Sequence, residues 1–140
     1  MKSGKIINDD DTIKQLLIDS KTIAVVGLSP KPERDSHMVA KYLKEHGYKI
    51  IPVRPAQKEI LGEKVYSSLD DIDEPVDIID VFRNSAQIMP HALEALRIKP
   101  KLFWMQQNIE NQEAAELLNR EGIDVVMDKC IKVEHDFLCS

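Results

Sequence analysis

A loop rich in hydroxyl and cationic side chains is the strongest chemical signal in this sequence. It begins at Gly27, directly after an apolar run, and contains Ser29, Lys31, Arg34 and Ser36. We expect Ser36 to cap a helix, whose free N–H groups and dipole would add to the positive potential of the two cations. This set of groups favours an anion such as phosphate, and the simpler alternative is a solvated polar loop.

A second cation stands at the end of another apolar run, where Arg54 lies between Val53 and Pro55. Proteins that bind NAD usually carry an acidic residue at this place, to hold a ribose hydroxyl. The cation instead suits a phosphate on a ribose, as in NADP or in the 3′-phosphate of coenzyme A. An ordinary surface arginine is the alternative, and Gly27 alone does not make a G-x-G-x-x-G fingerprint.

Signals for catalysis are absent from the sequence. Neither cysteine belongs to a C-x-x-C pair, there is no nucleophile elbow or P-loop, and no histidine pair has metal-ligand spacing among His37, His46, His91 and His135. We therefore assign no catalytic residue and no metal site. Cys130 is the one reactive-looking group, either a thiolate able to form a mixed disulfide with a thiol ligand or an unreactive, partly buried thiol.

Five short apolar runs must position these residues, and they span residues 23–26, 50–53, 76–82, 102–105 and 123–127. Runs that are apolar throughout are typical of parallel strands covered on both faces. Alternation with helices implies right-handed crossovers and three layers. We predict an α/β, Rossmann-like sandwich with a five-stranded parallel sheet in the order 3-2-1-4-5. Its ligand would lie beyond the carboxyl ends of the strands, where the order reverses.

Helix signals fall between and around these runs. We expect helices over residues 9–20, from Ser36 to a stop at Gly47, from Asn84 or Ser85 to about Ile98, and from Asn108 or Asn111 to near Gly122. A short helical turn is expected over residues 68–72, and Pro90 predicts a kink or a later helix start. Residues 129–140 have no clear period. Without a repeat or linker, residues 1–140 are predicted to form a single domain.

Bulk properties narrow the class of protein. The chain has 140 residues and a formal net charge of −5, which argues against a nucleic-acid partner. No apolar stretch approaches the roughly 20 residues that cross a bilayer, and the first residues lack a secretion signal. Two cysteines make no disulfide framework. We expect a cytoplasmic protein with a small-molecule ligand and no membrane partner, and a homodimer is left open.

Several segments, taken in order, carry a resemblance to a known family. They are AVVGLSP at 24–30, PERDS at 32–36, GYKIIPV at 47–53, VDIIDVFR at 76–83, WMQ at 104–106 and VMDKCIKVEH at 126–135. The chain resembles the small single-domain CoA-binding proteins, which are related to the CoA-binding domain of the succinyl-CoA synthetase α subunit. The similarity runs from about residue 12 to residue 135.

The resemblance implies a Rossmann-type domain that binds coenzyme A without a known reaction of its own. It would assign the phosphates to Gly27, Leu28, Ser29, Arg34 and Ser36, the adenosine end to Val53, Arg54 and Pro55, and the border of the cleft to Phe82, Arg83 and Asn84. One departure concerns Arg54 and Ala56, where relatives often have Asn and Lys around the proline. The adenosine contacts are therefore expected to differ.

The sequence thus predicts a protein that binds coenzyme A or a short acyl-CoA and has no evident catalytic residues. The alternatives are an NADP-dependent oxidoreductase or a subunit of an acyl-CoA ligase. A third interpretation is an interaction protein whose cleft has lost its ligand.

Overall fold

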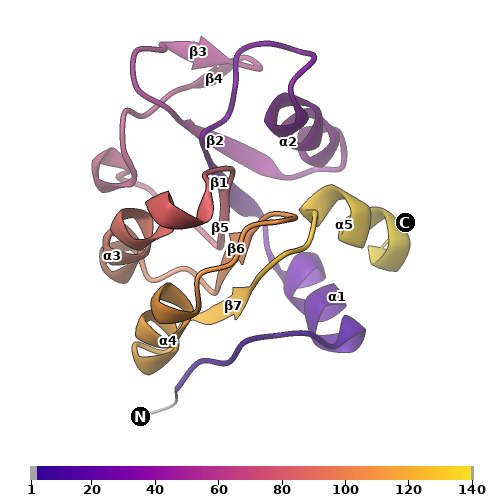
Figure 1. Ribbon diagram of the computed structural model, residues 1–140. Helices are drawn as coiled ribbons and strands as arrows, with labels where there is room; N and C mark the ends of the chain where they lie inside the picture. The colour runs from indigo at the N-terminus through magenta and orange to yellow at the C-terminus, as the bar shows by residue number, and fades with distance from the viewer. Residues whose placement is uncertain (1–2, 140) are drawn as a thin grey trace.

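Five parallel strands form the central sheet of the computed structural model, which describes residues 3–139. They are β1 (Thr22–Val26), β2 (Lys49–Val53), β5 (Ile78–Val81), β6 (Leu102–Met105) and β7 (Asp124–Val126). Their spatial order is β2-β1-β5-β6-β7, and every pairing in the sheet is parallel (Figure 1). Because helices cover both faces, the strands are apolar on both faces. The predicted α/β, Rossmann-like class is confirmed.

The predicted order of the strands is wrong in one respect. Counted along the chain the observed order is 2-1-3-4-5, because β5 pairs with β1 on the side opposite to β2. All four residues of β5 are buried, as expected for a strand with a neighbour on each side. The pattern of apolar residues shows that a strand is covered but not which edge it joins. The reversal of order therefore lies between β1 and β5, and Phe82 stands across it from Gly27.

The helices divide between the two faces of the sheet. One face carries α1 (Asp10–Asp19), α2 (Asp35–Glu45) and α5 (Ile131–Cys139), and the other carries α3 (Ile88–Ile98) and α4 (Gln112–Arg120) with the short turn η1 (Leu69–Asp71) (Figure 1). Right-handed crossovers account for α2 on one face and for η1, α3 and α4 on the other, because the chain moves one way from β1 to β2 and the other way from β2 through β7. Each face has its own apolar core.

Capping side chains explain where two of the helices, α1 and α4, begin. Asp9 accepts a hydrogen bond from the backbone of Thr12 at 2.9 Å and begins α1, and Asn111 caps α4 by accepting from Ala114 at 3.0 Å. A turn η2 (Ser85–Gln87) precedes α3, so Pro90 falls in the first turn of that helix, where its missing N–H costs little. The later start expected from Pro90 is confirmed.

Three features of the fold were not predicted from the sequence. The tail forms α5, with Ile131 and His135 buried at a spacing of four residues. A small antiparallel pair, β3 (Glu59–Ile60) and β4 (Glu63–Lys64), lies between β2 and η1. The N-terminal segment lies along β7, where the N–H of Ile7 donates to the carbonyl of Val125 at 2.7 Å. Among the helices described, none has the length and apolar character needed to cross a membrane.

Candidate functional site

The turn after β1 brings the ends of three strands together. Gly27 has a φ of 81°, and its N–H donates to the carbonyl of Val53 at 2.9 Å. A Cβ on Gly27 would lie 2.7 Å from the backbone oxygen of Phe82. A glycine is therefore required at this position for two reasons, the left-handed backbone conformation and the close approach of the end of β5.

Two buried serines fix the loop that follows. The hydroxyl of Ser36 accepts from the N–H of Ser29 at 3.0 Å, and the hydroxyl of Ser29 accepts from the N–H of Lys31 at 3.1 Å. His37 Nδ1 donates to the carbonyl of Ser29 at 2.9 Å, since a carbonyl only accepts. Both hydroxyls keep their own hydrogen for a further acceptor, so the loop is rigid and still able to donate.

Helix α2 begins inside this loop and lacks a capping side chain. Its N-cap is Arg34 and not Ser36, so the predicted cap is wrong; the Ser36 hydroxyl is turned back to Ser29 instead. Without a cap, the first N–H groups of α2 and its dipole stay available to an anion.

A cavity of about 670 Å³, the loop pocket, opens in front of this loop. Its cationic residues are Lys31, Arg34 and Arg54, and none of their side chains has a hydrogen bond or salt bridge within residues 3–139. Glu33 and Asp35 also line it and reduce the net positive charge. Gly27 and Phe82 form its floor beside the sheet.

A second cavity of about 460 Å³, the proline pocket, lies past the end of β2. Val53, Arg54 and Pro55 line it, so it adjoins the loop pocket through Arg54. Its far wall has His91, whose Nδ1 lies 2.9 Å from the carboxylate of Glu94. Arg83 reaches this wall with a buried Nε that has no hydrogen-bond partner among the described residues.

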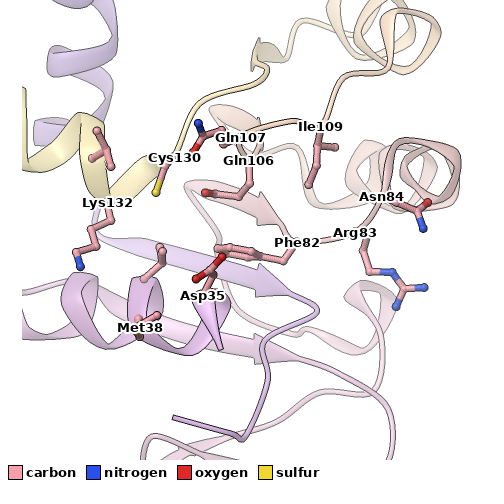
Figure 2. Close-up of a pocket in the computed structure, with 12 residues that line it drawn as sticks. Asp35, Met38, Phe82, Arg83, Asn84, Gln106, Gln107, Ile109, Cys130 and Lys132 are labelled. Carbon is pink, nitrogen blue, oxygen red and sulfur yellow. The ribbon is translucent and has the colours of Figure 1, made fainter. Parts of the chain in front are cut away.

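The third cavity, the cysteine pocket of about 530 Å³, lies past β5 and β6 beside α2 and α5 (Figure 2). Met38, Val39, Ile109 and Val133 give it an apolar wall, and Cys130 opens into it. Asp35 and Phe82 line both this pocket and the loop pocket, so the two are adjacent. Charged groups of mixed sign also line it, namely Asp35, Arg83 and Lys132.

A buried polar pair lies beneath the cysteine pocket. Asp80 of β5 is fully buried, and its carboxylate accepts from the amide Nε2 of Gln106 at 2.5 Å. The second oxygen of Asp80 has no partner among the described residues. Burial raises the pKa of Asp80 to about 7, against the opposing effect of the Gln106 hydrogen bond. Such a costly group in the middle of a strand needs a reason beyond packing.

The indole of Trp104 holds the segment that carries Cys130. Its Nε1 donates to the carbonyl of Lys129 at 2.7 Å, and the ring is completely buried. Trp104 is therefore a core residue, and it also fixes the wall of the pocket. Within residues 3–139 no group of three or more His, Cys, Asp or Glu side chains is arranged to hold a metal ion.

A family model described as a CoA binding domain matches residues 21–136. This chain belongs to the CoA-binding domain family. The match extends from the start of β1 into α5 and so includes all three pockets. The resemblance inferred from the sequence segments is thereby confirmed.

Members and relatives of the CoA-binding domain family differ in size. The uncharacterised protein YneT of Bacillus subtilis is 51% identical over 123 residues, which are 88% of this chain and 91% of YneT. A hypothetical protein from Pyrococcus horikoshii has a solved structure that matches with a TM-score of 0.92, 37% identity and full coverage of both chains. The acetate–CoA ligase (ADP-forming) I subunit alpha of Pyrococcus furiosus is 37% identical over 86 residues, 57% of this chain. This match spans 18% of that subunit.

The predicted site residues of this CoA-binding domain mostly line the three pockets. The loop pocket has Gly27, Ser29, Arg34 and Ser36, the proline pocket has Val53, Arg54 and Pro55, and the cysteine pocket has Phe82, Arg83 and Asn84. Leu28 is the exception, because its side chain is fully buried in the core. Which of these residues contact a ligand stays a prediction.

Some lining residues went unpredicted. Gln106 and Met38 lie in the cysteine pocket, and Gln57 in the loop pocket. A signal existed for Gln106, since it directly follows an apolar run. No signal existed for Met38, whose place depends on which face of α2 meets α5.

Proposed function

We propose that this protein binds coenzyme A or a short acyl-CoA and catalyses no reaction by itself. The observation that carries the proposal is the loop pocket, where two buried hydroxyls, an uncapped helix start and unpaired cations face one cavity. Groups of this kind bind phosphate oxygens well. Membership of the CoA-binding domain family supports the same ligand.

The three adjacent pockets suggest how the ligand would lie. Its diphosphate would occupy the loop pocket, against Ser29 and Arg34. The adenosine would enter the proline pocket, with Arg54 between the two cavities beside the ribose phosphate. The remaining arm would pass Phe82 toward the cysteine pocket.

The role proposed for Arg54 makes a prediction about the ribose phosphate. Dephospho-CoA lacks that phosphate, so it should bind at least about tenfold more weakly than coenzyme A, because a charge-assisted contact is lost. Isothermal titration calorimetry on the purified protein measures both affinities. Equal affinities would reject the role of Arg54. Tight binding of NADPH together with no binding of coenzyme A would favour the oxidoreductase alternative instead.

Arg34 provides the matching test on the protein side. Arg34→Ala should lower the affinity for coenzyme A by about tenfold, since it removes one cation from the loop pocket without touching the core. Arg120→Ala on α4 is the control, because that arginine is also exposed and lines none of the three pockets. A silent Arg34→Ala would indicate that the loop pocket holds no phosphate.

A further inference from the structure

Gln106 is a buried amide that lines a pocket. It directly follows β6, is only 4% exposed, and forms part of the wall of the cysteine pocket. Figure 2 shows it reaching into the space between Cys130 and Phe82. Asp80 on the neighbouring strand β5 holds the Gln106 side chain in this position, because Nε2 of Gln106 donates a hydrogen bond to the Asp80 carboxylate.

This hydrogen bond decides which atom of Gln106 faces the cavity. With Nε2 bound to Asp80, the free group is the carbonyl oxygen Oε1, and the bond to Asp80 is the only side-chain hydrogen bond of Gln106 within residues 3–139. Among the described residues the Asp80 side chain has no other partner, and its second oxygen is unpaired there. The pair therefore presents one fixed acceptor to the cavity. A ligand that fills the cavity displaces water from this oxygen, so a donor on the ligand is needed to keep it hydrogen-bonded.

The surroundings of Gln106 define the kind of ligand that would supply the donor. The nearby wall is apolar, with Met38, Val39 and Ile109, and suits an uncharged chain. The loop pocket adjoins it through Asp35 and Phe82, so the same molecule can reach both cavities. The ligand would carry its anionic end in the loop pocket and a neutral chain with an N–H donor beside Gln106.

We propose that the cysteine pocket binds the neutral, amide-containing arm of the ligand, and that Gln106, oriented by Asp80, accepts a hydrogen bond from an amide N–H of that arm. The proposal rests on the function proposed above and adds a specificity-determining residue to it. This contact would give thiol carriers that contain an amide a higher affinity than nucleotides that fill the loop pocket alone.

Two ligands that differ only in the arm test this directly. Coenzyme A carries the arm, and 3′-phosphoadenosine 5′-diphosphate is the same molecule without it. Calorimetry should show that Gln106→Met lowers the affinity for coenzyme A by about five- to tenfold, the effect of one buried hydrogen bond. The affinity for the truncated ligand should stay within about twofold. Gln112→Met on α4 is the matched control, because that glutamine is exposed and lines none of the three pockets.

Two results with the variants would overturn the proposal. Unchanged binding of coenzyme A by Gln106→Met would show that the amide makes no contact with the ligand. An equal loss of affinity for both ligands would show that Gln106 supports the fold and makes no specific contact with the arm. Neither result would affect the phosphate contacts, so the function proposed above would stand.

A measurement on the unaltered protein covers the case in which Gln106→Met does not fold. Cys130 lines the cysteine pocket, and Cys139 lies outside it at the end of α5. Bound coenzyme A should slow alkylation of Cys130 by iodoacetamide at least about fivefold, while the truncated ligand should not. Cys139 is the internal reference, and trypsin separates the two cysteines at Lys132.

The remaining outcomes of the alkylation experiment are also decisive. Equal alkylation of Cys130 with and without saturating coenzyme A would overturn the proposal, because the arm would lie elsewhere. Failure of both ligands to bind would overturn the proposed function itself, and this inference with it.

Discussion

At the scale of single residues, the main finding is a carboxyl group buried where the fold does not need one. Asp80 lies between Val25 and Trp104 in the sheet, and within residues 3–139 its side chain has one hydrogen bond and one unpaired oxygen. A group of this kind lowers the stability of the fold whenever it is ionised. Its presence under the cysteine pocket is best understood through Gln106, which it orients.

The raised pKa of Asp80 predicts a particular pH dependence of stability. The folded protein keeps this carboxyl protonated up to about pH 7, whereas in the unfolded chain it ionises near its ordinary pKa of 3.8. Its contribution to stability is therefore complete below about pH 4 and is lost as the pH rises through 7. Asp80→Asn cannot ionise and still accepts from Gln106. Relative to the wild type it should gain on the order of a few kcal/mol between pH 4 and pH 8.

Urea unfolding at a series of pH values measures this difference. Asp71→Asn is the control, since Asp71 is an exposed aspartate of η1 and should show no such gain. A constant difference between wild type and Asp80→Asn across this pH range would mean that Asp80 is ionised in the fold at all these pH values.

The sequence allowed the cations of the site to be predicted but not this pair. Arg34 and Arg54 follow apolar runs within loops, where charge is a visible signal. Asp80 stands inside an apolar run, and its partner Gln106 is 26 positions away. Their pairing depends on β5 and β6 being neighbours in the sheet, and the amino-acid sequence alone does not give the order of the strands.

At the scale of elements, the turn between β1 and α2 controls the geometry of the site. Gly27 touches the end of β5, and Ser36 in α2 holds Ser29 in the loop. The phosphate groups proposed for the loop pocket would therefore contact a surface whose shape depends on β1, α2 and β5.

A substitution at Gly27 tests this close approach. Gly27→Ala should destabilise the fold by about 1–3 kcal/mol, because its Cβ would lie 2.7 Å from the Phe82 carbonyl and its φ is 81°. Gly47→Ala is the matched control: its φ is 96°, but a Cβ there has no neighbouring atom within 4 Å. Thermal unfolding of both variants gives the comparison. Equal destabilisation would show that only the backbone angle matters at Gly27.

Elements were predicted from the sequence unevenly, for physical reasons. Strands with both faces buried are visible in the sequence as apolar runs, such as residues 102–105. Capping residues such as Asn111 mark the starts of helices. Helix α5 was missed because a histidine, His135, occupies one of its buried positions, next to Tyr42. The order of strands was also wrong, since it depends on which edge of β1 receives β5.

At the scale of the whole molecule, three pockets lie along one edge of the sheet and share residues with one another. Arg54 joins the proline and loop pockets, and Phe82 joins the loop and cysteine pockets. Gly27 and Phe82, which both line the loop pocket, flank the point where the strand order reverses, and this is where open parallel sheets bind ligands. An elongated ligand with a charged middle and two less charged ends fits this arrangement.

A crystal structure of the protein with coenzyme A would show where each part of the ligand lies. We predict the diphosphate in the loop pocket, within hydrogen-bond distance of Ser29 or Arg34, and the arm beyond Phe82 with its thiol end near Cys130. Coenzyme A found elsewhere on the molecule, with the loop pocket free of phosphate and Arg34 turned away, would contradict this prediction.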